Sequence, residues 1–351
     1  MDQGQVQGPE ALKSNRKLLF QRSEVLAARH IAYPFAGPFT TLKETTLVTL
    51  TSHYGISGDV PFINITLGRD TPLFIDPCRI RLSGTPMPFA ADAVECMDTY
   101  FGTIGAAVLS DDQDQRQHAE ALLRKFKEPR ETHLGYARNS INGHGGAEDI
   151  GAGIWSAMNE DIKALFTLGI LKHLEDLSMY VEDVAADRTS DITARIIFGA
   201  LADFTTAMLQ KYPEFTGNGN TTVDVDRQVW DPVNCQWVSR TMTLPCVDGD
   251  PIMLVPKEWA GNSILMSSGR FFETTLLGFV QAEKTSVLPD GSLLLPTKKT
   301  LLQQKSPARG RDTNLAVTLR AYDGGIDLVK RHHIWVADRY QDSLLKQGKA
   351  A

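Results

Sequence analysis

Apolar residues recur at helical spacing in the stretch that follows Asp187. Ile192, Ile196 and Phe204 fall on one face, the pattern of an amphipathic helix with one buried side. Ser190 or Thr189 precedes this stripe and is a good N-cap residue, because its hydroxyl can accept a hydrogen bond from an amide of the first turn. The pattern predicts a helix that begins near residue 190.

After Lys211 the apolar pattern changes to that of β-strands. Three segments are rich in Val, Thr, Trp and Ile: Thr222–Trp230, Gln236–Leu244 and Ile252–Val255. The connectors Asp231–Asn234 and Asp248–Pro251 contain Asp, Asn, Gly and Pro, which favour turns. We therefore expect an antiparallel three-stranded meander.

Periodicity places further helices on both sides of this meander. They cover Pro9–Arg29, Phe89–Leu109, Gln113–Lys127, Met158–Leu177, Phe271–Gln281 and Asp327–Leu345. Strands are expected at Thr41–Tyr54, Val60–Leu67 and in the apolar run that ends at Asp76. The chain is predicted to be an α+β protein with a central mixed or antiparallel sheet flanked by helices. Residues 1–8 read as a disordered tail and residues 9–351 as one interwoven domain, with a sub-boundary near residues 128–153.

Composition limits the class of protein. The chain has 351 residues and a formal net charge of −6, which argues against a surface covered with basic side chains. No run reaches the roughly 18 apolar residues of a membrane span, and the N-terminus lacks the pattern of a signal peptide. We expect a cytoplasmic protein without a membrane partner.

Cysteine and histidine spacing predicts no zinc site. The four cysteines show no C-x-x-C spacing, and the eight histidines include the pair His332 and His333 but no H-E-x-x-H motif. His173 lies at the edge of an apolar stripe and is expected to be a packed histidine.

Three aspartates are candidates for a catalytic metal site. Asp76 follows a buried strand, where α/β proteins often place reactive groups. Asp187 and Asp191 are four residues apart, so a helix would bring them to one side, where carboxylates could hold Mg²⁺. The alternative is structural, because an Asp-Pro pair opens turns and acids in a first helical turn interact with the helix dipole.

Lys257 ends the apolar string LVPK and could stabilise phosphate charge. A nuclease motif with an acid two residues before a strand lysine is absent here. Asp250 lies seven residues before Lys257, roughly 23 Å along an extended strand. A nuclease would therefore need a divergent arrangement.

A basic stretch follows residue 297. Lys298, Lys299, Lys305, Arg309 and Arg311 occur without an acidic residue between them, so this segment is the best candidate for contacts with nucleic-acid phosphates. The alternative is an exposed basic loop without a ligand.

The glycine-rich stretch from Asn139 to Gly153 could bring amides close to an anion at the start of a helix, but it lacks the ending of a phosphate loop. It reads either as a mobile loop or as part of a small-nucleotide site.

Four strings occur in a fixed order along the chain: LFIDP (Leu73–Pro77), ADRTSDIT (Ala186–Thr193), LVPK (Leu254–Lys257) and PTKK (Pro296–Lys299). In these strings the chain resembles uncharacterised bacterial proteins associated with mobile elements and anti-phage defence loci. The resemblance implies a bacterial, cytoplasmic context and a nucleic-acid or defence role, and it assigns no catalytic residue.

Two functions from different classes remain open. The first is a nucleic-acid-directed defence protein acting as a Mg²⁺-dependent nuclease, with Asp76, Asp187 and Asp191 at the metal and Lys257 at the phosphate. The second is a non-catalytic sensor or scaffold subunit that binds a protein encoded nearby, in which the same acids cap helices and form ion pairs.

Overall fold

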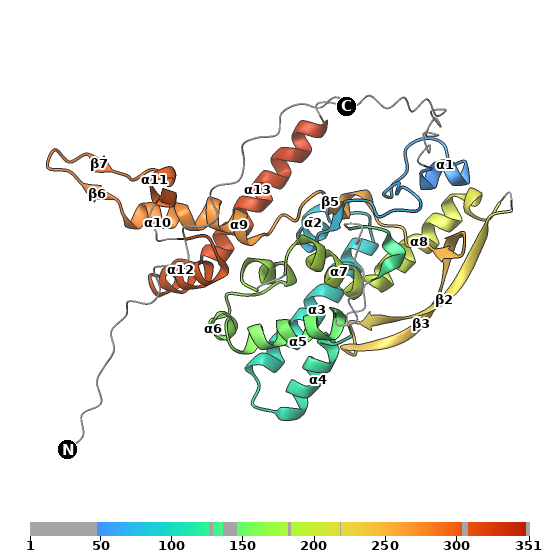
Figure 1. The fold of residues 1–351 in the computed structure, drawn as a ribbon, viewed down its shortest axis with the longest axis horizontal. Helices are drawn as coiled ribbons and strands as arrows, with labels where there is room; N and C mark the ends of the chain where they lie inside the picture. The colour runs from blue at the N-terminus through green and yellow to red at the C-terminus, as the bar shows by residue number, and fades with distance from the viewer. Residues whose placement is uncertain are drawn as a thin grey trace, which may run out of the picture. The chain divides into compact units, whose positions relative to one another are not determined.

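Helices make up most of the described chain, and its strands form three small antiparallel sheets (Figure 1). The computed structural model describes residues 48–125, 129–135, 146–181, 184–217, 219–303 and 308–348. These residues belong to one compact unit, residues 47–351. The predicted tail, the predicted helix Pro9–Arg29 and Lys305 lie outside the described residues.

The first half of the described chain is helical apart from one short strand. Its elements are α1 (Leu50–Tyr54), β1 (Phe74–Ile75), α2 (Pro77–Ser83), α3 (Phe89–Leu109), α4 (Gln113–Leu123), η1 (Arg130–Thr132), α5 (Gly146–Asn159), α6 (Lys163–Thr167), η2 (Leu174–Met179), α7 (Ala186–Ile196) and α8 (Phe198–Lys211).

The second half contains the meander and a further group of helices. Its elements are η3 (Pro213–Phe215), β2 (Thr221–Asp231), β3 (Gln236–Val247), β4 (Asp250–Pro251), η4 (Lys257–Trp259), β5 (Ala260–Gly261), α9 (Ser268–Phe271), the π-helical segment η5 (Phe272–Leu276), α10 (Leu277–Glu283), β6 (Ser286–Val287), β7 (Leu293–Leu294), α11 (Lys298–Gln303), α12 (Arg311–Asp323) and α13 (Leu328–Gly348).

The α+β class and the antiparallel meander are confirmed. β2 and β3 pair in register from Thr221 opposite Cys246 to Asp231 opposite Gln236. The third strand is β4, which lies before the predicted segment Ile252–Val255. That segment is buried, but its backbone groups bond to separate places in the fold and form no ladder. The partners are the Pro245 carbonyl of β3, the Glu131 carbonyl of η1, the Thr205 hydroxyl of α8 and the Ile63 amide. The remaining strands form two further two-stranded sheets, β1 with β5 and β6 with β7, instead of one central sheet.

The described residues contain neither of the two strands predicted near the start of the chain. The segment Thr41–Tyr54 ends in α1, which Thr49 caps by accepting a hydrogen bond from the Ser52 amide. The segment Val60–Leu67 contains isolated bridges only. Its alternating apolar residues are buried, but their backbone groups bond to different partners. The alternation of apolar residues in this segment therefore reflects burial of side chains, and the segment does not pair with a neighbour as a β-strand.

The predicted helix after Asp187 is two helices. α7 and α8 meet at an angle of 72° at Ile197, a buried residue that leaves helical geometry. Because α7 begins at Ala186, Ser190 lies in its second turn and is not the N-cap. Its hydroxyl instead accepts a hydrogen bond of 2.9 Å from the Ile75 amide, which ties α7 to β1.

The glycine-rich stretch falls partly outside the described residues. Its part from Gly146 onward is helical and belongs to α5. A Cβ atom added at Gly151 would lie 2.3 Å from the carbonyl oxygen of Leu123. This glycine therefore allows α5 to approach the end of α4 closely.

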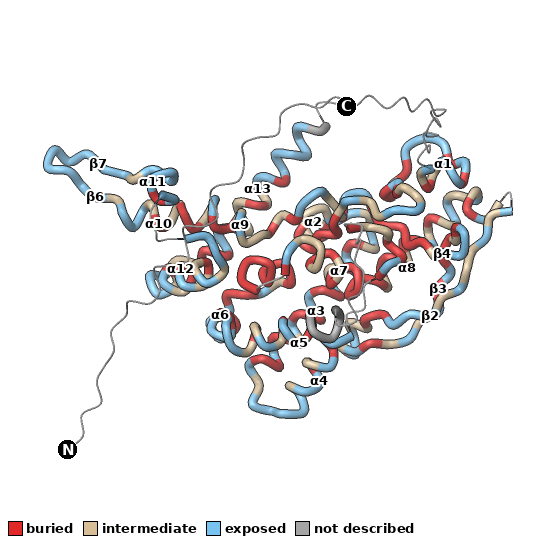
Figure 2. Tube along the Cα trace, in the orientation of Figure 1, coloured by how far each residue is buried: buried red, intermediate tan, exposed pale blue. Residues whose placement is uncertain are grey.

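Buried apolar side chains form one continuous core through the described residues (Figure 2). α3 crosses its centre and packs against α2, α4, α7 and α8. The core holds β1 and α2 in place, and Asp76 lies between these two elements.

Candidate functional site

Asp76 is buried, and its carboxylate links the start of α2 to the backbone at Leu265. It is 1% exposed and is the N-cap of α2, where its Oδ1 accepts the Cys78 amide at 3.0 Å. Its Oδ2 accepts the Leu265 amide at 2.7 Å, and the Arg79 guanidinium lies 3.6 Å away. Both carboxylate oxygens therefore have protein partners.

The pKa of Asp76 reflects this position. Burial raises the pKa from its ordinary value of 3.8 to about 6, against the opposing effects of the Leu265 amide, Arg79 and the Cys78 amide. Asp76 thus carries an electrostatic cost at neutral pH that its hydrogen bonds only partly offset.

Asp187 and Asp191 lie on α7 and are half-buried. Asp187 is in the first turn, where an anion interacts favourably with the helix dipole. A Cβ atom at Gly135 would lie 3.1 Å from Asp187 Oδ1, and Gly135 has a φ of 117°, so glycine suits this position. Asp191 lies in the second turn of α7, so the structural role expected of an acid in the first turn, interaction with the helix dipole, does not apply to it.

The three acids do not form the predicted three-ligand set. Within the described ranges, no three His, Cys, Asp or Glu side chains come together as ligands for a metal ion. Asp76 departs from the prediction for a physical reason, since both its oxygens bond backbone amides. Asp187 and Asp191 remain a pair on one helix.

Lys257 is placed differently from the prediction. It begins η4 instead of ending a strand, and its ammonium group forms an ion pair with Asp59. Both side chains are at the surface, and Asp59 is 90% exposed, so the pair contributes little to stability.

The predicted basic loop is partly structured. Lys298 begins α11 and donates from Nζ to the Glu273 carbonyl at 2.9 Å. Arg309 forms an ion pair with the carboxylate of Glu273. Lys299 is exposed on α11, and Arg311 begins α12. The segment around Glu273 therefore gathers two of the predicted phosphate-binding side chains.

A charged cluster that the sequence did not single out lies between α2, α3 and η2. Arg81 donates from Nε to Glu175 Oε1 at 2.9 Å and makes two hydrogen bonds to Asp98, at 2.7 and 3.0 Å. Glu175 is 1% exposed. Burial would raise the pKa of Asp98, but the nearby His173 ring, whose Nδ1 lies 3.7 Å from Oδ1, and the hydrogen bonds from Arg81 outweigh burial and lower that pKa.

His333 of α13 reaches the same cluster. His333 Nε2 lies 2.6 Å from Asp176 Oδ1, and its ring is 5.4 Å from that of His173. Burial alone would lower the pKa of His333, but its bond to Asp176 raises it. The neighbouring His332 is buried, its Nδ1 lies 2.8 Å from Thr275 Oγ1, and burial lowers its pKa to about 3.

The buried strip formed by residues 175–180 joins this cluster to the helices that follow residue 266. Its polar groups bond to Met266 and to α12 of the C-terminal segment that follows it (residues 267–351). The contacts are Ser178 Oγ to Met266 O at 2.6 Å, Asn314 Nδ2 to Met179 O at 2.9 Å, and Tyr180 OH with Thr318 Oγ1 at 3.0 Å. Through these contacts the charged cluster and the buried strip connect the part of the chain before residue 267 to the C-terminal segment. We call the cluster and the strip together the polar joint.

Spacing could not have revealed this joint, since Arg81, Asp98, Glu175 and His333 come from four separate segments. The only hints were the adjacent pair His332 and His333 and the packed position of His173.

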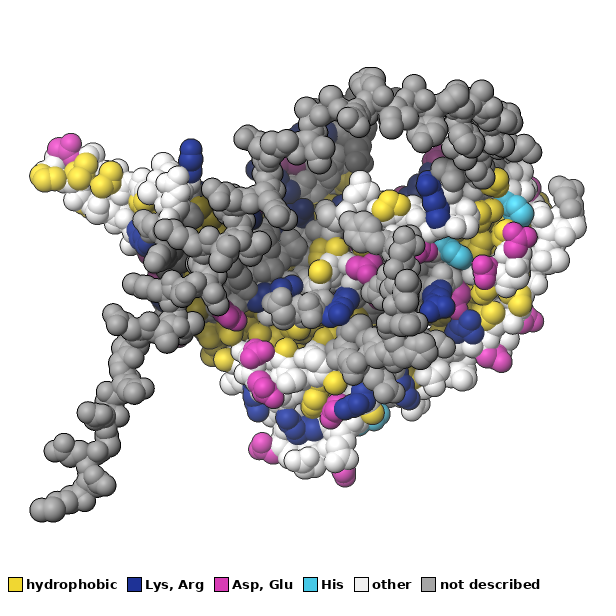
Figure 3. All heavy atoms as spheres, viewed as in Figure 1, with side chains coloured by type: hydrophobic (Ala, Val, Ile, Leu, Met, Phe, Trp, Pro, Cys, Tyr) yellow, Lys and Arg dark blue, Asp and Glu magenta, His cyan; other side chains and the backbone are white. Residues whose placement is uncertain are grey.

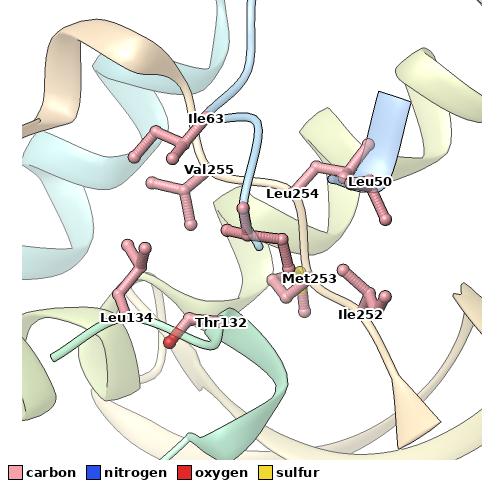
Figure 4. A pocket seen from close by; sticks show the side chains of 9 residues that line it. Leu50, Ile63, Thr132, Leu134, Ile252, Met253, Leu254 and Val255 are labelled. Atoms are coloured by element: carbon pink, nitrogen blue, oxygen red, sulfur yellow. The ribbon is translucent and has the colours of Figure 1, made fainter. Parts of the chain in front are cut away.

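Two pockets in the described residues are lined mainly by apolar side chains. One lies where η1 meets the segment before η4, and its space is too small for a water molecule (Figure 4). It is lined by Leu50, Ile63, Ile65, Thr132, Leu134, Ile252, Met253, Leu254 and Val255. A second lies beside α5, with space for about one water molecule. Neither is lined by a charged residue, so neither has the polar groups that position a substrate.

Exposed apolar side chains gather on the hairpin formed by β6 and β7. Val287, Leu293 and Leu294 are 69%, 62% and 55% exposed, and Leu288 and Leu295 are also exposed. Figure 3 shows these hydrophobic side chains along the hairpin, with an acidic side chain near its end. We call residues 286–295 the apolar hairpin.

Four of the nine other large exposed hydrophobic residues in the described ranges also follow residue 266. They are Leu302, Ile334, Leu344 and Leu345, the last two on the exposed end of α13 (Figure 2). The C-terminal segment is thus the part of the described chain with the most uncovered apolar surface.

No single helix in the described ranges has the length and apolar content of a membrane span. The bent pair of α7 and α8 meets those criteria when the two helices are taken together, and most of their residues are buried in the core.

Comparison with known proteins identifies a family but no activity. The model of a domain of unknown function, DUF8370, matches residues 55–266. No curated protein and no solved structure matches the chain. The matched region contains Asp76, Asp187, Asp191 and Lys257 and ends before the apolar hairpin. Since the match covers more than half of its length, the chain belongs to the DUF8370 family of domains of unknown function.

Proposed function

We propose that this protein is a non-catalytic, cytoplasmic subunit of a multi-protein bacterial defence complex, and that it binds its partners through the C-terminal segment. The observation that carries the proposal is the apolar hairpin. The bacterial and defence context rests on the resemblance of the four sequence strings.

The apolar hairpin has the properties of an unoccupied interface. Single exposed aliphatic residues are normal on a protein surface, but contiguous apolar surface marks interaction sites. Here five aliphatic side chains lie within ten consecutive residues on a two-stranded hairpin. An isolated two-stranded hairpin is marginally stable in water, so covering it with a partner would stabilise it.

The predicted catalytic and nucleic-acid-binding residues support the same function, because several of them have structural partners. Asp76 caps α2 and holds the Leu265 amide, Lys257 pairs with Asp59, and Arg309 pairs with Glu273. These are the roles that the scaffold hypothesis assigns to them.

The proposal predicts that co-purification depends on the hairpin. With the native locus expressed from a plasmid and this protein affinity-tagged, products of neighbouring genes should elute with it in fixed stoichiometry. Val287→Ser with Leu293→Ser should reduce their recovery at least about tenfold, because both side chains lie on one face of the hairpin.

The matched control is Val233→Ser, which replaces a valine that is 83% exposed in the β2–β3 turn. It should leave recovery unchanged. Equal recovery with the hairpin variant and the control would overturn the assignment of partner binding to the hairpin.

A second candidate function is a Mg²⁺-dependent nuclease, and the observation that favours it is charge. Residues 267–351 contain 13 Lys and Arg against 8 Asp and Glu, although the whole chain is acidic. Asp187 and Asp191 would hold Mg²⁺ together with substrate phosphates, a pattern that needs only one or two carboxylates. Lys299 and Arg311 would contact the nucleic-acid backbone. If the protein is a nuclease, the wild type should cleave nucleic acid in the presence of Mg²⁺, and Asp187→Ala should abolish this cleavage.

A further inference from the structure

Charge divides sharply between the two parts of the chain. Residues 48–266 contain 30 acidic and 17 basic side chains, while residues 267–351 contain 8 acidic and 13 basic ones. The family domain is thus strongly acidic and the C-terminal segment is basic. Opposite charges on two surfaces steer their association and fix its orientation.

Ion pairs within the C-terminal segment join some of its acids to its own arginines. Arg309 pairs with Glu273, and Arg320 pairs with Glu283 through two hydrogen bonds of 2.9 and 2.8 Å. Lys299 has no carboxylate partner among the described residues and is exposed. Lys298 and Lys299, both exposed at the start of α11, place positive charge three and four residues after the apolar hairpin.

The apolar hairpin is uncovered on both faces. Val287 lies opposite Leu293 in the pairing of β6 and β7, so these two side chains share a face. Leu294 follows Leu293 directly and points to the other face. A partner must therefore surround the hairpin or bind along it.

The chemistry of the hairpin favours a protein partner over a lipid bilayer. Its end carries Asp290, whose pKa is lowered by hydrogen bonds from the Ser292 hydroxyl and amide. A carboxylate that stays ionised opposes insertion into apolar lipid. The segment from Ser286 to Leu295 also contains no Trp or Tyr, the residues enriched at membrane interfaces.

We infer that the partner at this surface is a second copy of the chain, bound head to tail. The apolar hairpin and the basic residues at its base dock on the acidic family domain of the next copy. This inference rests on the proposed function, because it names one partner of the same surface. A head-to-tail contact uses two different surfaces, so each copy can bind one copy at each end, and the assembly grows until it closes.

Sedimentation velocity of the full chain tests this assembly. The weight-average sedimentation coefficient should rise with protein concentration at low NaCl and fall towards the monomer value at high NaCl. Val287→Ser with Leu293→Ser should weaken self-association at least about tenfold, whereas Val233→Ser should associate like the wild type. Circular dichroism should show unchanged folding, since the substituted residues are exposed.

Mixing separates head-to-tail docking from a symmetric contact. The hairpin variant keeps its acidic domain, so the fluorescently labelled variant should not associate alone but should sediment with unlabelled wild type. A monomeric wild type at all concentrations would overturn the inference. Self-association that does not change with NaCl concentration would also overturn it. Failure of the labelled variant to sediment with the wild type would overturn it as well.

Two other partners have distinct signatures. Binding of the wild type to phosphatidylglycerol vesicles without self-association would replace the second copy with a membrane and overturn the inference. Hairpin-dependent recovery of a neighbouring gene product by a protein that is monomeric alone would also overturn it, while leaving the proposed function intact.

Discussion

Replacing Arg81 with methionine is expected to lower the free energy of unfolding by about 3–5 kcal/mol. The substitution leaves the Glu175 carboxylate, which is 1% exposed, without the guanidinium that now lies 2.9 Å from it. An uncompensated buried charge is among the most destabilising single changes in a protein. Urea denaturation followed by circular dichroism measures the effect as a lower midpoint.

The other partner of Arg81 supplies the control. Asp98 is 43% exposed, so Asp98→Asn should cost about 1 kcal/mol or less. Combining Arg81→Met with Glu175→Leu should recover part of the loss, because the buried charge is then gone. If Arg81→Met is no more destabilising than Asp98→Asn, the joint does not depend on this buried ion pair.

Asp76→Asn is expected to change how stability depends on pH. The native pKa of Asp76 is about 6 and its ordinary value is 3.8, so the native state binds the proton more tightly than the unfolded state. Its contribution to stability is therefore fully present below about pH 4 and lost as the pH rises through 6. The wild type should lose roughly 3 kcal/mol relative to Asp76→Asn over this range.

The amide variant should be the less stable protein at the acidic end of that range. Its Oδ1 can accept only one of the two amides that Asp76 now binds, and its Nδ2 would face the other donor. Asp92→Asn, at an exposed position in the first turn of α3, is the matched control for the substitution. A constant difference between the wild type and Asp76→Asn from pH 4 to 7 would contradict the buried position of this carboxyl group.

The sequence predicted correctly those helices and turns that are determined by residues within the element itself. The helix Phe89–Leu109 has the predicted bounds, and the turn at Asp231 joins two paired strands as expected. Such elements depend on their own periodicity and turn residues. The strand predicted at Val60–Leu67 failed because its alternating residues are buried by separate contacts, which only the tertiary structure determines.

The candidate site was less predictable, because its contacts connect distant segments. Asp76 follows a strand as predicted, but sequence could not show that the Leu265 amide, 189 positions away, occupies its second oxygen. The polar joint was missed for the same reason, since Glu175 and Arg81 are 94 positions apart. The apolar hairpin could have been noticed from the leucines that follow Gly291, but an apolar run alone does not distinguish a buried strand from an exposed one.

Cleavage by the purified protein tests the non-catalytic function most directly. Plasmid, single-stranded DNA and RNA would be incubated with the full chain in Mg²⁺, in Mn²⁺ and in EDTA, beside folded Asp187→Ala. We predict no metal-dependent cleavage of any substrate by either protein. Cleavage by the wild type that EDTA and Asp187→Ala both abolish would contradict this and establish the nuclease.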